Sequence, residues 1–176
     1  TAGIVTLPYL QWQNILQEAG DLPDSEWAVN LNGSRRQYAP WRRTVCQSSP
    51  GFLDYMRGLK EDALARGADG LWIDNSYLAP CRCPRCERSF RAHLASHRGD
   101  LLDFLRLKDF SRVEIPPAFA DRVLDPIQQA YIEFNCARCE GTLRTVKEHM
   151  ERLDSRALFA SNPALFRGRN TYLNGV

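Results

Sequence analysis

The sequence contains no long apolar run and no excess of charge of one sign. None of its hydrophobic stretches approaches the roughly 18–20 residues that a membrane-spanning helix needs. Its 23 lysines and arginines are nearly balanced by 21 aspartates and glutamates, which leaves a net charge of +2. Such a balance gives no electrostatic case for binding nucleic acid or an anionic membrane. We therefore expect neither partner.

Signs of disorder, of a fibrous repeat and of a targeting leader are absent as well. The 176 residues are 44% hydrophobic and 25% charged, which is typical of a globular protein with a single domain over residues 1–176. The chain starts at Thr1, with no initiator methionine and no charged-then-apolar leader. We interpret it as a processed product or a fragment, and its compartment stays open.

Cysteine is too scarce, at six residues, for a small secreted disulfide scaffold, yet it is locally crowded. Cys81, Cys83 and Cys86 fall within six residues, a density typical of thiolate ligands on one metal ion. At the CxxC spacing, two thiolates can bind the same Zn²⁺ ion. We expect a closed, structural zinc site with no open position for substrate.

Short apolar segments alternate with amphipathic ones along the chain. Helices are expected over residues 12–19, 50–66, 84–96, 101–105 and 127–153, and strands over 3–10, 27–31, 70–74 and 157–161, with a further strand starting near 172. An Arg-rich polar loop is expected through Arg43. The alternation predicts an α/β fold with a parallel sheet.

The segment Gly70–Asp74 (GLWID) is typical of a buried parallel strand, which puts Trp72 in the core. The strand ends at Asp74, whereas Asp69 belongs to the turn that enters it. Because chemistry in parallel α/β folds is located at the carboxyl ends of the strands, Asp74 is the candidate catalytic carboxylate.

Three segments together resemble glycoside hydrolases of family 42, the β-galactosidase-like enzymes. They are GSRRQY (33–38), VCQSSPGFLDYM (45–56) and GADGLWIDNSYLAPCRCPRCERSFRAHL (67–94). The resemblance implies a (β/α)8 TIM barrel that hydrolyses O-glycosidic bonds of a carbohydrate substrate. That family often assembles through further domains, so the resemblance also implies a homo-oligomer formed through regions outside this chain.

The resemblance also implies site residues. The zinc ligands would be Cys46 together with the three clustered cysteines, because an upstream cysteine completes the site in that family. Cys136 and Cys139, three residues apart on a helix, are the rival for the fourth ligand, although packing of the helix is the favoured interpretation for them. Asn75 matches a family asparagine and would contact the sugar.

Two loop residues are further candidates for substrate contacts. Arg36 lies within the GSRRQY segment, and Trp41 is an aromatic residue in a polar loop that could stack on a sugar ring.

The sequence departs from the family at the residue after Asn75. The family has its glutamate acid/base catalyst there, but this chain has Ser76, which has no carboxyl proton to donate. The family's nucleophile lies on a later strand than any found here. Asp74 instead resembles the terminal aspartate of the DGxxxD strand in α-fucosidase-like and α-galactosidase-like barrels, where that residue is the nucleophile.

A complete barrel takes roughly 250 residues. We therefore interpret this chain as a partial barrel. Two alternatives stay open: a catalytically inactive carbohydrate-binding pseudoenzyme, suggested by Ser76, and a zinc-knuckle module that contacts protein or nucleic acid through the Arg-rich loop.

Overall fold

The computed structural model describes residues 3–12, 14–16, 22–76, 79–117 and 125–162. Its elements, in chain order, are β1 (Tyr9–Gln11), β2 (Asn14–Leu16), the 3₁₀ helix η1 (Asp24–Glu26), β3 (Gln37–Ala39), β4 (Arg42–Thr44), α1 (Pro50–Ala65), β5 (Gly70–Asp74), α2 (Pro84–His97), α3 (Asp100–Leu105), α4 (Pro126–Leu153) and β6 (Leu158–Asn162).

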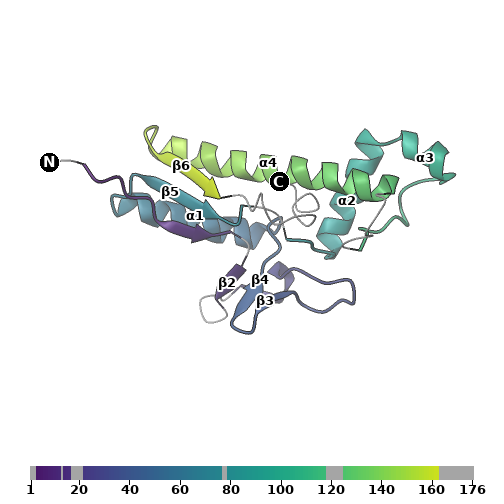
Figure 1. Ribbon diagram of the computed structural model, residues 1–176, viewed down its shortest axis with the longest axis horizontal. Helices are drawn as coiled ribbons and strands as arrows, with labels where there is room; N and C mark the ends of the chain where they lie inside the picture. The colour runs from purple at the N-terminus through teal and green to yellow at the C-terminus, as the bar shows by residue number, and fades with distance from the viewer. Residues whose placement is uncertain (1–2, 13, 17–21, 77–78, 118–124, 163–176) are drawn as a thin grey trace.

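A parallel sheet of β1, β5 and β6, with β5 in the centre, organises one half of the molecule. The helices α1 and α4 follow β1 and β5 in the chain and lie alongside the strands (Figure 1). This βαβαβ order confirms the expected mixed α/β fold with a parallel sheet.

The core of this half lies between the sheet and the two helices. Alternate residues of a strand point to opposite faces, so Leu71 and Ile73 share the helix-facing side of β5. Both are completely buried. They belong to one apolar cluster with residues from both helices, namely Phe52 and Met56 from α1 and Val146 and Met150 from α4.

No helix of the described residues covers the opposite face of the sheet (Figure 1), which corrects the expectation for Trp72. This side chain alternates with Leu71 and Ile73 and is 43% exposed, so it is not a core residue. It lies in register with Tyr9 of β1 and Ala160 of β6. The error arose because an apolar strand was assumed to be covered on both faces.

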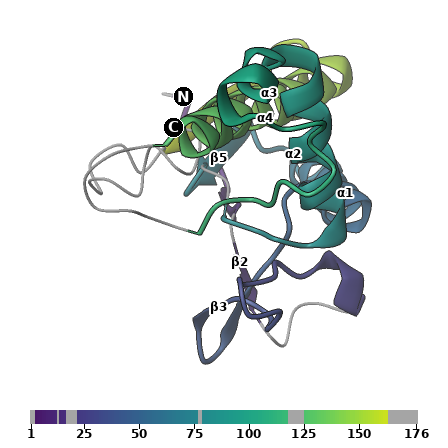
Figure 2. The same cartoon turned by 90° about the vertical axis from the view of Figure 1, so that its right-hand side faces the viewer.

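A second, antiparallel sheet of β2, β4 and β3 lies apart from the helices (Figure 1 and Figure 2). It overturns two expectations. Residues 14–16 form a strand paired with β4 and not part of a helix, because tertiary pairing outweighs local propensity. The polar loop before Cys46 contains the β3–β4 hairpin, and the strand expected at 27–31 is reduced to isolated bridges at Trp27 and Val29.

The predicted helix starts are confirmed. The Ser49 side chain accepts a hydrogen bond from the Phe52 amide at the start of α1, and Pro50 occupies its first turn. Asp125 and Gln128 form a capping box at the start of α4. Helix α4 has 28 residues, a length of about 42 Å. It contributes Tyr131 and Phe134 to a second core around α2.

The described helices include none that is long and apolar enough to span a lipid bilayer. The strand expected near Tyr172 lies outside the described residues.

Gly70 is the point of closest approach between β5 and β6. A Cβ atom there would collide with the backbone of Leu158, including its carbonyl oxygen. We predict that Gly70→Ala lowers the free energy of unfolding by at least about 2 kcal/mol, measured by urea denaturation, because the backbone of a paired strand cannot move aside cheaply. The control is Gly58→Ala in α1, where a Cβ meets nothing within 4 Å. This substitution should increase the free energy of unfolding by about 0.5–1 kcal/mol, because alanine favours a helix more than glycine does. Equal effects of the two substitutions would contradict this account.

Lys60 is an ionisable residue on the buried side of α1, with only 3% of its surface exposed. Burial, followed by the nearby Arg57, lowers its pKa to about 8. Between pH 8 and about 10.5 the unfolded chain therefore binds more protons than the folded chain, so stability rises with pH in this window. We predict that Lys60→Met removes that rise and increases the free energy of unfolding at pH 7 by about 1–2 kcal/mol. The exposed Lys147, changed in the same way, should have no such effect when both are followed by urea denaturation across pH.

Candidate functional site

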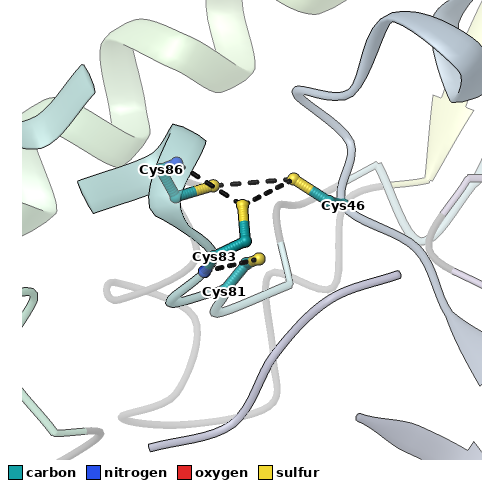
Figure 3. Close-up of side chains that lie close together, drawn as sticks. All are labelled: Cys46, Cys81, Cys83 and Cys86. Carbon is teal, nitrogen blue, oxygen red and sulfur yellow. Dashed lines mark hydrogen bonds between the residues drawn. The ribbon is translucent and has the colours of Figure 1, made fainter. Parts of the chain in front are cut away.

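Four cysteine side chains converge, one from the segment between β4 and α1 and three from the segment that leads into α2. Cys46 Sγ lies 3.5 Å from Cys86 Sγ and 3.8 Å from Cys83 Sγ, and the sulfurs of these three and Cys81 all lie within 4.8 Å of one another (Figure 3). All four residues are buried and none forms a disulfide. The structure thus brings together the four cysteines named from the sequence.

Local structure explains how these thiols meet. Cys46 precedes α1, and its amide donates a hydrogen bond to the Glu26 carbonyl. Cys81 lies on the segment after β5, which is held to the segment between η1 and β3 by a hydrogen bond from the Arg82 amide to the Val29 carbonyl. Cys83 is the N-cap of α2, and its sulfur accepts a hydrogen bond from the Cys86 amide. The start of α2 favours negative charge on both sulfurs.

Hydrogen bonds within the cluster shift the pKa values of the thiols in different directions. Hydrogen bonding with Cys46 lowers the pKa of both Cys81 and Cys83, whereas hydrogen bonding with neighbouring thiols raises the pKa of Cys46 and Cys86. A metal ion bound by all four sulfurs would displace the protons that the thiols carry.

The donor set and spacing fit a tetrahedral divalent cation. With Zn–S bonds of about 2.3 Å, the sulfurs of such a site are separated by about 3.8 Å, close to the separations found here. Four protein ligands would fill the coordination shell, so the site is suited to a structural ion.

The other two cysteines lie outside this cluster. Cys139 is buried on α4, and its thiol donates a hydrogen bond of 3.1 Å to the Ser76 carbonyl. Cys136, one turn earlier, is exposed. The rival ligand pair is thus not assembled with the clustered sulfurs. The packing interpretation fits the buried Cys139 but not the exposed Cys136.

The carboxyl end of the parallel sheet carries the second group of interest. Asp74 lies in register with Gln11 of β1 and Asn162 of β6, so polar residues form a row across the three strand ends. The Asp74 carboxylate accepts hydrogen bonds from the Tyr9 hydroxyl (2.5 Å) and from the side-chain amides of Asn75 (2.6 Å) and Asn162 (2.8 Å). These donors hold it in one orientation on the open face of the sheet.

Two of these donors have distinctive environments. Partial burial, followed by the hydrogen bond to Asp74, raises the pKa of Tyr9 to about 12, so its hydroxyl remains a donor at neutral pH. Asn75 has a left-handed backbone with φ of 50°, which asparagine tolerates better than most residues. The chain turns away from the sheet at this point.

Asp69, at the other end of β5, has a structural role. Its carboxylate accepts hydrogen bonds from the Thr6 amide and hydroxyl, and these bonds lower its pKa.

The remaining predicted substrate contacts are not joined to Asp74. Trp41 is 61% exposed in the turn between β3 and β4. Arg36 lines a hollow of about 500 Å³ together with Pro80, Arg82 and Ile115. Within the described ranges, neither residue forms a hydrogen bond or ion pair with Asp74 or Asn75. Their role in binding sugar stays a prediction.

Sequence reasoning missed Tyr9, Asn162 and Arg138. Asn162 carried a usable signal, because it ends a predicted strand as Asp74 does. Tyr9 and Arg138 carried none, since only the fold brings Tyr9 to Asp74 and Arg138 to the cysteine cluster, where its guanidinium lies 3.7 Å from Cys86 Sγ.

The chain matches no protein-family model, and it has no significant match among curated proteins. Its fold is similar to solved β-galactosidase structures. The enzyme from the haloarchaeon Halorubrum lacusprofundi has a TM-score of 0.70 at 18% identity, over 89% of this chain and 26% of that one. The enzyme from Bacillus circulans has a TM-score of 0.59 at 19% identity, over 79% and 24%. Gan42B, a GH42 β-galactosidase, has a TM-score of 0.62 at 17% identity, over 78% and 22%.

The chain thus spans about a quarter of the length of these β-galactosidases. At such low identity the likeness concerns the fold alone. It supports a glycoside hydrolase-like fold, the class that the motifs at residues 33–94 resemble.

A metal ion held by all four sulfurs would cross-link segments far apart in sequence. We predict that the chain purified with zinc loses about 10 °C in melting temperature when a strong chelator removes the ion, because about 4 kcal/mol of binding free energy is lost at saturating metal. Cys83→Ser should melt near the chelated value, with or without added zinc. Cys136→Ser, an exposed cysteine outside the cluster, should behave like the parent chain. A melting temperature unmoved by chelator and zinc would refute metal binding.

Proposed function

We propose that this chain is a zinc-stabilised part of a (β/α)8 glycoside hydrolase barrel, and that the protein carrying it hydrolyses O-glycosidic bonds of a carbohydrate. The observation that carries the proposal is Asp74, at the carboxyl end of the central parallel strand on the face that no described helix covers. Substrate-binding residues in barrel enzymes occupy this end of the strands.

Asp74 is the nucleophile, or the carboxylate that stabilises positive charge at the sugar carbon. Tyr9, Asn75 and Asn162 orient it. Beside it, Tyr9 (59% exposed) and Trp72 offer aromatic surface on the same face, against which the apolar side of a sugar ring can stack. The carboxylate and the amides can exchange hydrogen bonds with hydroxyl groups, and the aromatic rings can stack on a sugar. Together these groups suit a polyhydroxylated ligand.

Retaining hydrolysis needs a second carboxyl group, roughly 5–5.5 Å from the first, to protonate the leaving group. The hydrogen-bond partners of Asp74 in the described part of the chain are a phenol and two amides. Ser76, at the position of the resembled family's acid, is buried. We therefore assign the proton donor to polypeptide beyond the residues described here.

Ser76 also favours a second candidate function, binding of carbohydrate without turnover. Its hydroxyl has no hydrogen-bond partner among the described residues and cannot replace a carboxylic acid. The zinc-knuckle alternative is less favoured, because arginines of the Arg-rich loop already have partners within the chain. Arg35 forms an ion pair with Asp24, Arg42 donates a hydrogen bond to Asn14, and Arg43 lies over the Trp27 ring.

The structural ion would be Zn²⁺, bound by the four clustered cysteines. It would supply no chemistry to the sugar, and its effect would be to fix the segment that follows β5. Gln47, next to Cys46, accepts a hydrogen bond from the Ala79 amide and holds the same segment.

We predict that Asp74→Asn in the protein that carries this chain lowers kcat on a chromogenic β-galactoside by about three orders of magnitude or more, because an amide cannot attack the sugar. Binding of the intact sugar, measured by calorimetry, should change only a few-fold. Asp62→Asn, an exposed carboxylate on α1 paired with Arg66, is the matched control and should leave both unchanged.

The two candidate functions give different results. Sugar binding by the parent protein without any turnover supports the non-catalytic function. Turnover that survives Asp74→Asn would rule out the assigned role of Asp74.

A further inference from the structure

The cysteine cluster poses a problem of charge. Four thiolates around a divalent cation carry a net charge of −2, and all four side chains are buried. Charge buried without a counterpart is unfavourable. A nearby cation or hydrogen-bond donor is therefore needed to stabilise the filled site.

The arginines of the cysteine loop do not meet this need. Arg82 forms ion pairs with Glu87 and Glu114. Arg85 lies 3.8 Å from the Glu26 carboxylate. Their charge is balanced by carboxylates and not by sulfur, although they are nearest to the cysteines in sequence.

A different arginine, Arg138 on α4, reaches the cluster. Its Nη2 lies 3.7 Å from Cys86 Sγ, within hydrogen-bond range for sulfur, although the two residues are 52 positions apart. In the described part of the chain, no carboxylate forms an ion pair with it. Its positive charge is therefore directed to the thiol cluster.

Other contacts fix the guanidinium in this position. Nη1 donates a hydrogen bond to Asn135 Oδ1 (3.3 Å), and Nη2 donates one to the Ser48 hydroxyl. The guanidinium carbon also lies 4.8 Å from the centre of the Phe134 ring. A planar fork held by an amide, a hydroxyl and a ring is preorganised, which a flexible lysine would not be.

We propose that Arg138 is a positioning residue of the metal centre: its guanidinium donates a hydrogen bond to the Cys86 thiolate and raises the affinity of the four-cysteine site for a divalent metal. The inference rests on the proposed metal-binding role of the cluster. It gives α4 a direct part in metal retention, in addition to its packing against α1 and α2.

The test measures zinc affinity of the full chain by competition with a chelating dye. Arg138→Gln should weaken binding by about 10- to 100-fold, the usual effect of removing a residue that supports a metal ligand. The absorption spectrum of the cobalt(II) form should still report four thiolates, because no ligand is removed. Arg144→Gln, on the same helix and paired with Glu140, is the matched control and should bind zinc as the parent does.

Two further variants guard against misfolding and separate charge from packing. Arg138→Met keeps apolar contact with Phe134 but has no charge, so it should show the same loss as Arg138→Gln. Arg138→Lys restores charge without the fork and should recover part of the affinity, which a purely packing role would not predict.

The outcomes separate this inference from the proposed function. Parent-like affinity in Arg138→Gln or Arg138→Met, with tight zinc binding by the parent chain, overturns the role of Arg138 alone. Absence of zinc binding by the parent chain overturns the metal centre itself, and the role of Arg138 with it.

Discussion

The convergence of four thiols is the constraint on which the rest of the site depends. It joins the segment before α1, the segment after β5 and the first turn of α2, which are separated by up to 40 residues in the chain. Because Cys46 and Gln47 are adjacent, one short segment both completes the cluster and accepts a hydrogen bond from the Ala79 amide. The segment that follows β5 is thereby held in place within a few residues of Asp74.

Helix α4 connects this cluster to the open sheet. Two successive residues on one turn serve the two ends: Arg138 contacts Cys86, and Cys139 donates a hydrogen bond to the Ser76 carbonyl. The same helix packs on β5 through Val146 and Met150. A displacement of α4 would therefore disturb the cysteine cluster and the end of β5 together. The cysteine cluster and the carboxyl end of β5 thus share one structural support.

Prediction from sequence succeeded where the signal was local. The expected helix starts at residues 50 and 127 agree with α1 and α4 to within one residue, and the apolar run of β5 located the central strand. The crowded cysteines predicted a group of metal-ligating residues, and the structure brings four cysteines close enough to hold an ion. The antiparallel sheet was missed because β2, β3 and β4 are each three residues long, too short for periodicity to be read. The partners of Asp74 and of Cys86 were missed for another reason. Tyr9 is 65 residues from Asp74 in the chain and Arg138 is 52 residues from Cys86, so only the fold brings each pair together.

The burial of Ser76 restricts the side chains that position 76 can accept. Its backbone is held on both sides, by the Cys139 thiol at its carbonyl and by the Asn162 carbonyl at its amide, and its side chain is shut away from water. A codon change to glutamate would force a carboxyl group into this closed space, where an ionised acid without a partner is strongly disfavoured. Accommodating an acid at position 76 would thus require compensating changes on α4 and β6 as well. A carboxyl group that donates a proton near Asp74 would be accommodated more readily at another position than at this one.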